Sequence, residues 1–205
     1  MCIMKKKEEK MKFVAITGSI GCGKTTISNM LRDQGFLVYD IDKWVKHLYY
    51  KKDFLEVIQK FFPEVFNGDV FNKRKLRELV FSYPQKLKIL EEIIHPVLCK
   101  RLRKIIRNNK NQGLVFVDVA LLFEMGWDKY FNYIILADVD KEIQKRRVMD
   151  RDKITEEDFD KINNIQFSKQ KKQDKADFII DTGVSFDKLR GKVVKILEEL
   201  EDAEC

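Results

Sequence analysis

Short apolar runs alternate with amphipathic stretches along the chain, and this alternation predicts the fold. Short apolar runs are typical of strands that are buried on both faces of a parallel sheet. Five such runs are present: Phe13–Thr17, Phe36–Tyr39, Leu114–Val119, Tyr133–Ala137 and Phe178–Ile180. The stretches between them have helical spacing, and strand–helix–strand order favours right-handed crossovers. The pattern therefore predicts a three-layer α/β fold, with about five parallel strands and helices on both faces.

A long segment between Lys43 and Asn111 has no strong strand pattern. Apolar residues at helical spacing run from Leu87 to Ile106, interrupted by Pro96. Because proline removes a helical hydrogen-bond donor, we expect a kink or break near His95. The segment is predicted to be a mostly helical insertion after the second strand of the core.

A glycine-rich segment with the chemistry of a phosphate cradle follows the first predicted strand. Residues 18–25 read G-S-I-G-C-G-K-T, which satisfies the pattern G-x-x-x-x-G-K-[ST]. The glycines let backbone N–H groups approach phosphate oxygens, and the start of the next helix favours an anion. Lys24 is expected to reach the β- and γ-phosphates, and the Thr25 hydroxyl to bind Mg²⁺. The predicted ATP-binding residues are Gly21, Cys22, Gly23, Lys24, Thr25 and Thr26.

Two carboxylates, Asp40 and Asp42, follow the second predicted strand in V-Y-D-I-D. They share one side if the extended conformation persists, and ligands of open α/β sheets bind beyond the carboxyl ends of strands. Either could accept a proton from, or orient, a substrate hydroxyl. Alternatively, Asp42 caps a helix predicted over Lys43–Tyr50.

Two more acids lie near the end of the third predicted strand, where Asp118 follows the apolar residues LVFV. Asp118 stands where a carboxylate would bind Mg²⁺ directly or through water, although it could equally hydrogen-bond only the following loop. Glu124, in L-L-F-E, is a further candidate for substrate contact.

A basic helical stretch is predicted over Lys141–Arg151. Arg147 and Arg151 are four residues apart and lie on one face, where two guanidinium groups could clamp a triphosphate. The alternative is a solvated helix face. His95, next to Pro96, is a polar residue within the apolar stripe.

The net charge and the cysteine content argue against two classes of function, nucleic-acid binding and zinc or redox chemistry. The 205-residue chain has a net charge of +7, but its basic residues are interleaved with acids and form no nucleic-acid-binding module. Its four cysteines form no C-x-x-C pair, so they indicate neither a zinc nor a redox site. We find no signal peptide and no apolar run long enough for a membrane span. These features favour a cytoplasmic protein, and they leave its oligomeric state open.

Together, these motifs resemble the dephospho-CoA kinase family. The matching segments occur in order between Phe13 and Gly183: the glycine loop, Asp40-Ile-Asp42, His95-Pro96, Leu121–Glu124, Arg147–Asp152, Gln166, and Ala176-Asp177 followed by I-I-D.

The resemblance implies transfer of phosphate from ATP to the ribose 3′-hydroxyl of dephospho-CoA, with Mg²⁺, on a P-loop NTPase core. It implies that Asp42 is the base or orienting group, and that Lys24, Arg147 and Arg151 assist catalysis. Asp40, His95 and Glu124 would contact substrate. The expected organisation is a flexible lead (1–11), a core (12–42, 112–139, 176–205), a helical CoA-binding insertion (43–111) and a lid (140–175).

Three features depart from the family pattern. Ser19 and Cys22 replace commoner loop residues, and Ala120 replaces a proline. Asn72-Lys73 stands where Asp-Arg is usual, which loses bidentate geometry. Two other functions remain open: another P-loop nucleoside or nucleotide kinase, or an ATP-binding regulatory protein without catalysis.

Overall fold

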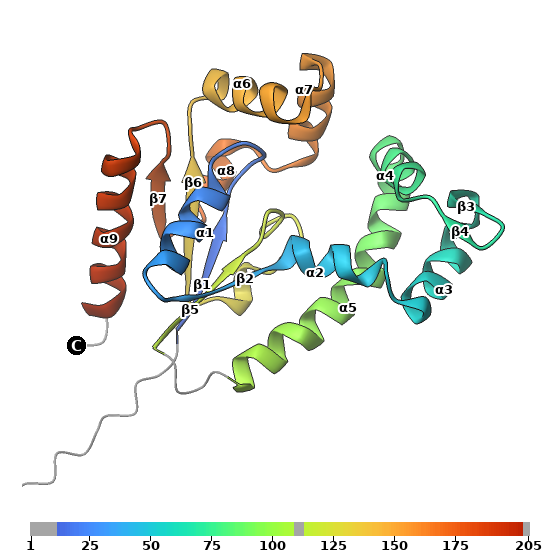
Figure 1. The fold of residues 1–205 in the computed structure, drawn as a ribbon, viewed down its shortest axis with the longest axis horizontal. Helices are drawn as coiled ribbons and strands as arrows, with labels where there is room; N and C mark the ends of the chain where they lie inside the picture. The colour runs from blue at the N-terminus through green and yellow to red at the C-terminus, as the bar shows by residue number, and fades with distance from the viewer. Residues whose placement is uncertain (1–11, 109–112, 203–205) are drawn as a thin grey trace, which may run out of the picture. The chain divides into compact units, whose positions relative to one another are not determined.

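A computed structural model describes residues 12–108 and 113–202 of the protein (Figure 1). Its strands are β1 (Lys12–Thr17), β2 (Leu37–Asp40), β3 (Phe66–Asn67), β4 (Val70–Phe71), β5 (Leu114–Asp118), β6 (Tyr133–Asp138) and β7 (Phe178–Asp181). Its α-helices are α1 (Lys24–Asp33), α2 (Ile41–Leu48), α3 (Lys52–Phe61), α4 (Lys73–Ser82), α5 (Pro84–Asn108), α6 (Lys141–Asp152), α7 (Glu156–Ile165), α8 (Lys169–Gln173) and α9 (Phe186–Asp202). Two short 3₁₀ helices are η1 (Pro63–Val65) and η2 (Asp128–Tyr130).

The chain forms two compact units. One contains the residues before Asp40 and after Arg107, and the other contains Asp40–Arg107. The predicted lead, residues 1–11, lies outside the described residues. No helix in the described ranges has the length and apolar character needed to cross a membrane.

The first unit is built on a five-stranded sheet with the order β2-β5-β1-β6-β7 (Figure 1). β1 pairs in parallel with β5 and β6, and β6 pairs in parallel with β7. Phe13, Val14, Ala15 and Ile16 are all buried, although successive residues of a strand point to opposite faces. Burial on both faces is what a parallel sheet between helical layers requires. The predicted α/β fold and its five strands are therefore confirmed.

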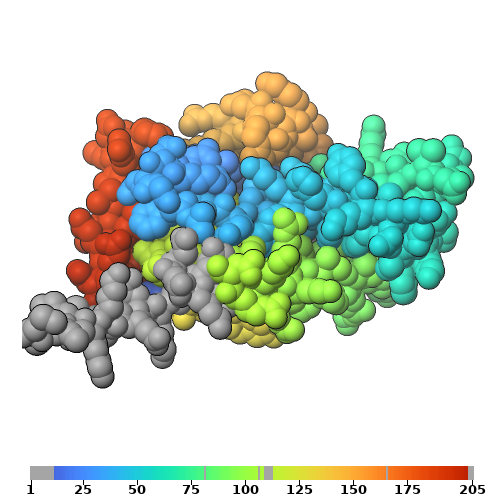
Figure 2. Space-filling model, turned by 60° about the horizontal axis from the view of Figure 1, so that its bottom comes forward, coloured from blue at the N-terminus to red at the C-terminus, as the bar shows by residue number. Residues whose placement is uncertain are grey.

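One face of this sheet packs against α1 and α9. Ile27, Met30 and Leu31 occupy the helical spacing that places them on one side of α1, where they join a buried cluster with Val14 of β1 and Val193 of α9. The two helices also contact each other, and Figure 2 shows their surfaces meeting. This packing fixes the start of α1, and with it the glycine-rich loop between β1 and α1.

The second unit is mostly helical, with one small hairpin. β3 and β4 pair antiparallel, with Phe66 opposite Phe71. Sequence analysis missed this hairpin because two-residue strands are too short to show alternation. Asn72, one of the departures from the family pattern, caps α4 by accepting a hydrogen bond from Lys75 N at 3.0 Å.

Of the kink or break predicted near His95, the break is wrong, because α5 continues through Pro96 from Pro84 to Asn108. A proline inside a helix removes one hydrogen bond, but its neighbours can still be held by packing. Leu90 and Ile94 before the proline, and Leu98 and Leu102 after it, are all buried. The continuous apolar stripe therefore keeps both halves of the helix in place.

Candidate active site

The loop between β1 and α1 has the backbone of a phosphate cradle. Gly21 and Gly23 have φ values of 78° and 81°, in the left-handed region that favours glycine. A Cβ atom at Gly21 would lie 2.5 Å from Val148 Cγ2, and one at Gly23 would lie 2.9 Å from Thr182 Oγ1. Both positions therefore need glycine for conformation and for space.

Helix α1 begins at Lys24, with Gly23 as its N-cap and no side-chain cap. The first N–H groups of a helix have no partner within the helix, so they and the helix dipole favour an anion at this end. Thr25 is exposed and Thr26 is half-buried in this first turn. The predicted ATP-binding segment thus has the local structure that phosphate binding requires.

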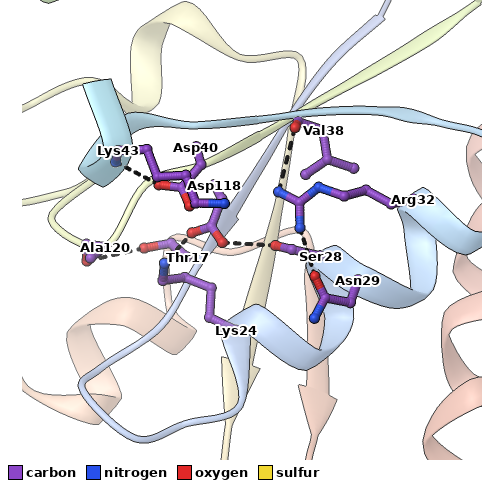
Figure 3. Close-up of polar contacts among 10 residues, drawn as sticks. All are labelled: Thr17, Lys24, Ser28, Asn29, Arg32, Val38, Asp40, Lys43, Asp118 and Ala120. Atoms are coloured by element: carbon purple, nitrogen blue, oxygen red, sulfur yellow. Dashed lines mark hydrogen bonds and ion pairs between the residues drawn. The ribbon is translucent and has the colours of Figure 1, made fainter. Parts of the chain in front are cut away.

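Lys24, Ser28 and Asp118 meet beside this loop (Figure 3). Lys24 Nζ forms an ion pair with Asp118 Oδ1, and Ser28 Oγ donates a hydrogen bond of 2.8 Å to Asp118 Oδ2. Asp118 is 3% exposed, so both partners offset the cost of burying its charge. The structure therefore joins two predicted site residues, 94 positions apart in sequence.

Cys22 points into the core. The side chain is 4% exposed and belongs to the cluster under α1 and α9. Burial, and then the negative charge of Asp138, raise the pKa of the Cys22 thiol to about 11. Cys22 thus contributes its backbone to the loop, while its side chain behaves as a small apolar group.

We expect Cys22 to resist alkylation in the folded protein, because the thiolate is the reactive form. A pKa about two units above the usual value lowers the thiolate fraction roughly 100-fold at pH 8. Iodoacetamide labelling followed by peptide mass spectrometry should show slow labelling in buffer and rapid labelling in urea. Equal rates in the two solvents would contradict the buried placement.

The raised pKa of Cys22 also makes the free energy of unfolding depend on pH. The folded state favours the protonated thiol, so its contribution is present below pH 9 and is lost as pH rises towards 11. The variant Cys22→Ala should lose less stability than the wild type over this window in calorimetric scans.

Asp40 and Asp42 occupy different local structures. β2 ends at Asp40, which is the N-cap of α2 and accepts a hydrogen bond from Lys43 N at 2.9 Å. Asp42 is an exposed residue in the first helical turn. The expectation that an extended backbone places both on one side is therefore wrong, and so is the expectation that Asp42 is the cap. Capping accounts for Asp40 and leaves the function of Asp42 to be explained.

The two arginines predicted for the lid bind different partners. Arg147 donates to Thr182 Oγ1 at 3.1 Å and to Thr182 O at 2.9 Å. Thr182 Oγ1 in turn donates to Cys22 O at 2.9 Å, which connects Arg147 to the cradle. Arg151 forms two hydrogen bonds with its neighbour Asp152 and keeps 60% of its side chain exposed. The structure therefore ties Arg147, but not Arg151, to the loop.

Glu124 and His95 have protein partners of their own. Glu124 Oε1 accepts from Phe167 N at 2.7 Å and pairs with Lys172 Nζ at 3.1 Å. His95 Nε2 lies 3.3 Å from Cys99 Sγ, one turn along α5. Their predicted substrate contacts stay predictions.

Four side chains that hold this site together were not predicted from the sequence: Ser28, Gln144, Lys172 and Thr182. Ser28 could have been found, because it lies one helical turn after Lys24 and so shares its face. The other three come from distant segments, and no local pattern marks them. Lys172 in particular sits in a run of charged residues that resembles a solvated surface.

The chain is similar to known proteins over most of its length. The dephospho-CoA kinase family model matches residues 12–187. The dephospho-CoA kinase of Bartonella henselae is 36% identical over 192 residues, covering 93% of this chain and 98% of that protein. A crystal structure of a Thermus thermophilus protein, 31% identical, superimposes with a TM-score of 0.82 and covers 93% of this chain and 98% of that one. A dephospho-CoA kinase structure from Campylobacter jejuni has a TM-score of 0.66 at 27% identity, covering 95% and 100% of the two chains. The chain therefore belongs to the dephospho-CoA kinase family.

Proposed function

We propose that the protein transfers the γ-phosphoryl group of ATP to the ribose 3′-hydroxyl of dephospho-CoA, giving coenzyme A and ADP. One observation carries this proposal: within the segment that matches the family, Lys24 stands at the start of an uncapped helix and in contact with a buried carboxylate. This is the arrangement of a phosphoryl-transfer cradle.

Each part of the cradle has a distinct task. The N–H groups of the loop and of the first turn of α1 hold the phosphate oxygens. Lys24 supplies a positive charge to the β- and γ-phosphates, and its effect grows as charge develops during transfer. Asp118 and Ser28 hold Lys24 in position. On the basis of the family resemblance, we assign Asp42 the role of orienting the acceptor hydroxyl and taking its proton.

We further propose that Mg²⁺ enters with ATP. Its ligands in proteins are oxygens, typically one or two carboxylates together with substrate phosphates and water. The Thr25 hydroxyl and the Asp118 carboxylate fit this donor set. Because both Asp118 oxygens already accept from Lys24 and Ser28, we expect Asp118 to act through water. The ion would supply charge neutralisation on the transferring phosphoryl group.

The remaining residues and segments have roles that follow from the resemblance. The helical unit, Asp40–Arg107, binds the CoA portion of the substrate, with Asp40 and His95 as contacts. Segment 140–175 is the lid, and Glu124 contacts substrate. Cysteines without a C-x-x-C pair suit a reducing cytoplasm, where we place the enzyme.

A coupled ADP-release assay tests the function. Turnover should depend on both ATP and dephospho-CoA, and a coenzyme A standard should co-elute with the product in chromatography. Turnover with shikimate or nucleoside acceptors but not with dephospho-CoA would indicate another kinase. Tight ATP binding without turnover of any acceptor would indicate a regulatory protein.

The lid arginines should differ in their effects. We expect Arg151→Ala to lower kcat about 10- to 100-fold, the size of a lost charge-assisted hydrogen bond to a phosphate. Its melting temperature should change little, since the side chain is largely exposed. Arg147→Ala should lower both kcat and stability, because it also removes two hydrogen bonds to Thr182. Arg146→Ala, exposed on the same helix, is the control. An equal effect of Arg146→Ala and Arg151→Ala would support a solvated face instead.

A further inference from the structure

A buried lysine links three separate segments behind the phosphate cradle. Lys172, on α8, has 1% of its side chain exposed. Its Nζ pairs with Glu124 Oε1 at 3.1 Å and donates to Ser19 Oγ at 3.2 Å. Glu124, with 9% exposed, also accepts from Phe167 N. The cluster thus joins the loop after β5, the segment before α8 and the outer end of the cradle.

A contribution to the stability of the fold is a poor explanation for burying this ion pair. Burying two opposite charges is costly, and well-packed apolar residues in their place are often as stable or more so. Removing only one partner is much worse, because it leaves the other charge buried and unpaired. A buried pair of this kind therefore has its clearest value where it fixes one particular geometry.

The charge of the cluster also limits what it can do. Lys172 and Glu124 together carry no net charge, so the pair adds little long-range attraction for phosphate. The ion pair can act on the cradle through a direct contact, the hydrogen bond from Lys172 Nζ to Ser19 Oγ. The next residue, Ile20, is held at its N–H by Gln166 Oε1 at 3.0 Å and at its carbonyl by Gln144 Nε2 at 2.7 Å.

We propose that Lys172 is a positioning residue for ATP binding. It holds Ser19, and with it the outer half of the cradle, against the segment that contains α6 and α8. The ion pair with Glu124 holds the Lys172 ammonium in the position from which it donates to Ser19. This inference rests on the proposed function only in taking ATP as the ligand of the cradle.

Three variants separate positioning from stability. Lys172→Met removes the charge and the donor, and leaves Glu124 unpaired. Lys172→Met with Glu124→Gln leaves no buried charge, while the glutamine oxygen can still accept from Phe167 N. Ser19→Ala removes the acceptor and leaves the ion pair intact. Lys161→Met, on exposed residue Lys161 of α7, which pairs with Glu157 one turn away, is the control. Each protein is studied by thermal unfolding, by calorimetry with ATP and Mg²⁺, and by steady-state kinetics.

We expect Lys172→Met to lower the melting temperature and to weaken ATP binding. The double variant should recover the melting temperature, while its Kd and KM for ATP stay raised about tenfold, the size expected for one lost hydrogen bond to a charged group. In the single variant Lys172→Met, the loss should appear more in the KM for ATP than in kcat, because it affects binding more than the chemical step. Ser19→Ala should melt like the wild type and bind ATP more weakly.

Recovery of ATP affinity together with stability in the double variant would show that the cluster is only structural, and would overturn the proposal. If the double variant does not fold, Ser19→Ala decides: wild-type ATP affinity in this variant also overturns it. A failure of the proposed function has a different signature, since the wild type would then lack dephospho-CoA turnover while the ATP affinities could still be compared.

Discussion

Lys24→Met is expected to lower kcat/KM by roughly 10²–10³-fold, the usual cost of removing one contact that stabilises charge in a transition state. Methionine keeps most of the length of the side chain and removes its charge. Stability should fall too, because Asp118 would remain buried without the Lys24 charge, and the hydrogen bond from Ser28 does not replace that charge. Loss of one partner of a buried ion pair costs about 3–5 kcal/mol, and somewhat less here because Lys24 is 14% exposed.

A second substitution separates these two effects. Lys24→Met with Asp118→Asn leaves no unpaired charge, so the melting temperature should recover while turnover stays low. Lys195→Met, exposed on α9, controls for loss of a lysine. Turnover of Lys24→Met within about twofold of the wild type would be incompatible with a cradle that acts by charge stabilisation.

Asp42→Asn is expected to lower kcat by about 10²–10⁴-fold, the range typical for loss of a general base. The amide keeps the shape of the side chain and part of its hydrogen bonding, but it cannot take the proton of the acceptor hydroxyl. ATP affinity measured by calorimetry should barely change, since the substitution leaves the cradle untouched. The melting temperature should change little, because Asp40, and not Asp42, caps α2.

Two controls make this prediction sharper. Asp53→Asn removes an exposed acid from the equivalent first turn of α3, so it matches the loss of favourable charge at a helix start, about 0.3–1 kcal/mol. Asp40→Asn keeps a good cap, because asparagine and aspartate cap helices equally well. Near-normal turnover of dephospho-CoA by Asp42→Asn would end the catalytic role of Asp42, and a large loss in Asp40→Asn would transfer that role to Asp40.

The main sheet and the cradle could both be predicted from the sequence. Each strand of the main sheet was visible as a short apolar run. The reason is clearest for β1, β5 and β6, which are buried almost throughout because both faces are covered. The cradle was visible because its glycines, lysine and threonine are adjacent in the chain, and a loop held by its own backbone depends little on distant residues. Predictions from the local sequence failed where tertiary packing determined the structure. Pro96 should interrupt a helix, but buried residues on both sides of it hold α5 together.

The distant side chains that hold the cradle in place could be identified from the fold but not from the sequence. Lys24 and Asp118 meet because β1 and β5 are neighbours in the sheet, and Thr182 reaches the cradle from the end of β7. Lys172 is the clearest example of a side chain whose surroundings could not be predicted from the sequence. In sequence it is one lysine in the charged run K-K-Q-D-K, whereas in the fold it is almost fully buried between Glu124 and Ser19. A charge pattern along the chain describes neighbours in sequence, but the cost of burying a charge, and the partner that offsets it, depend on neighbours in space.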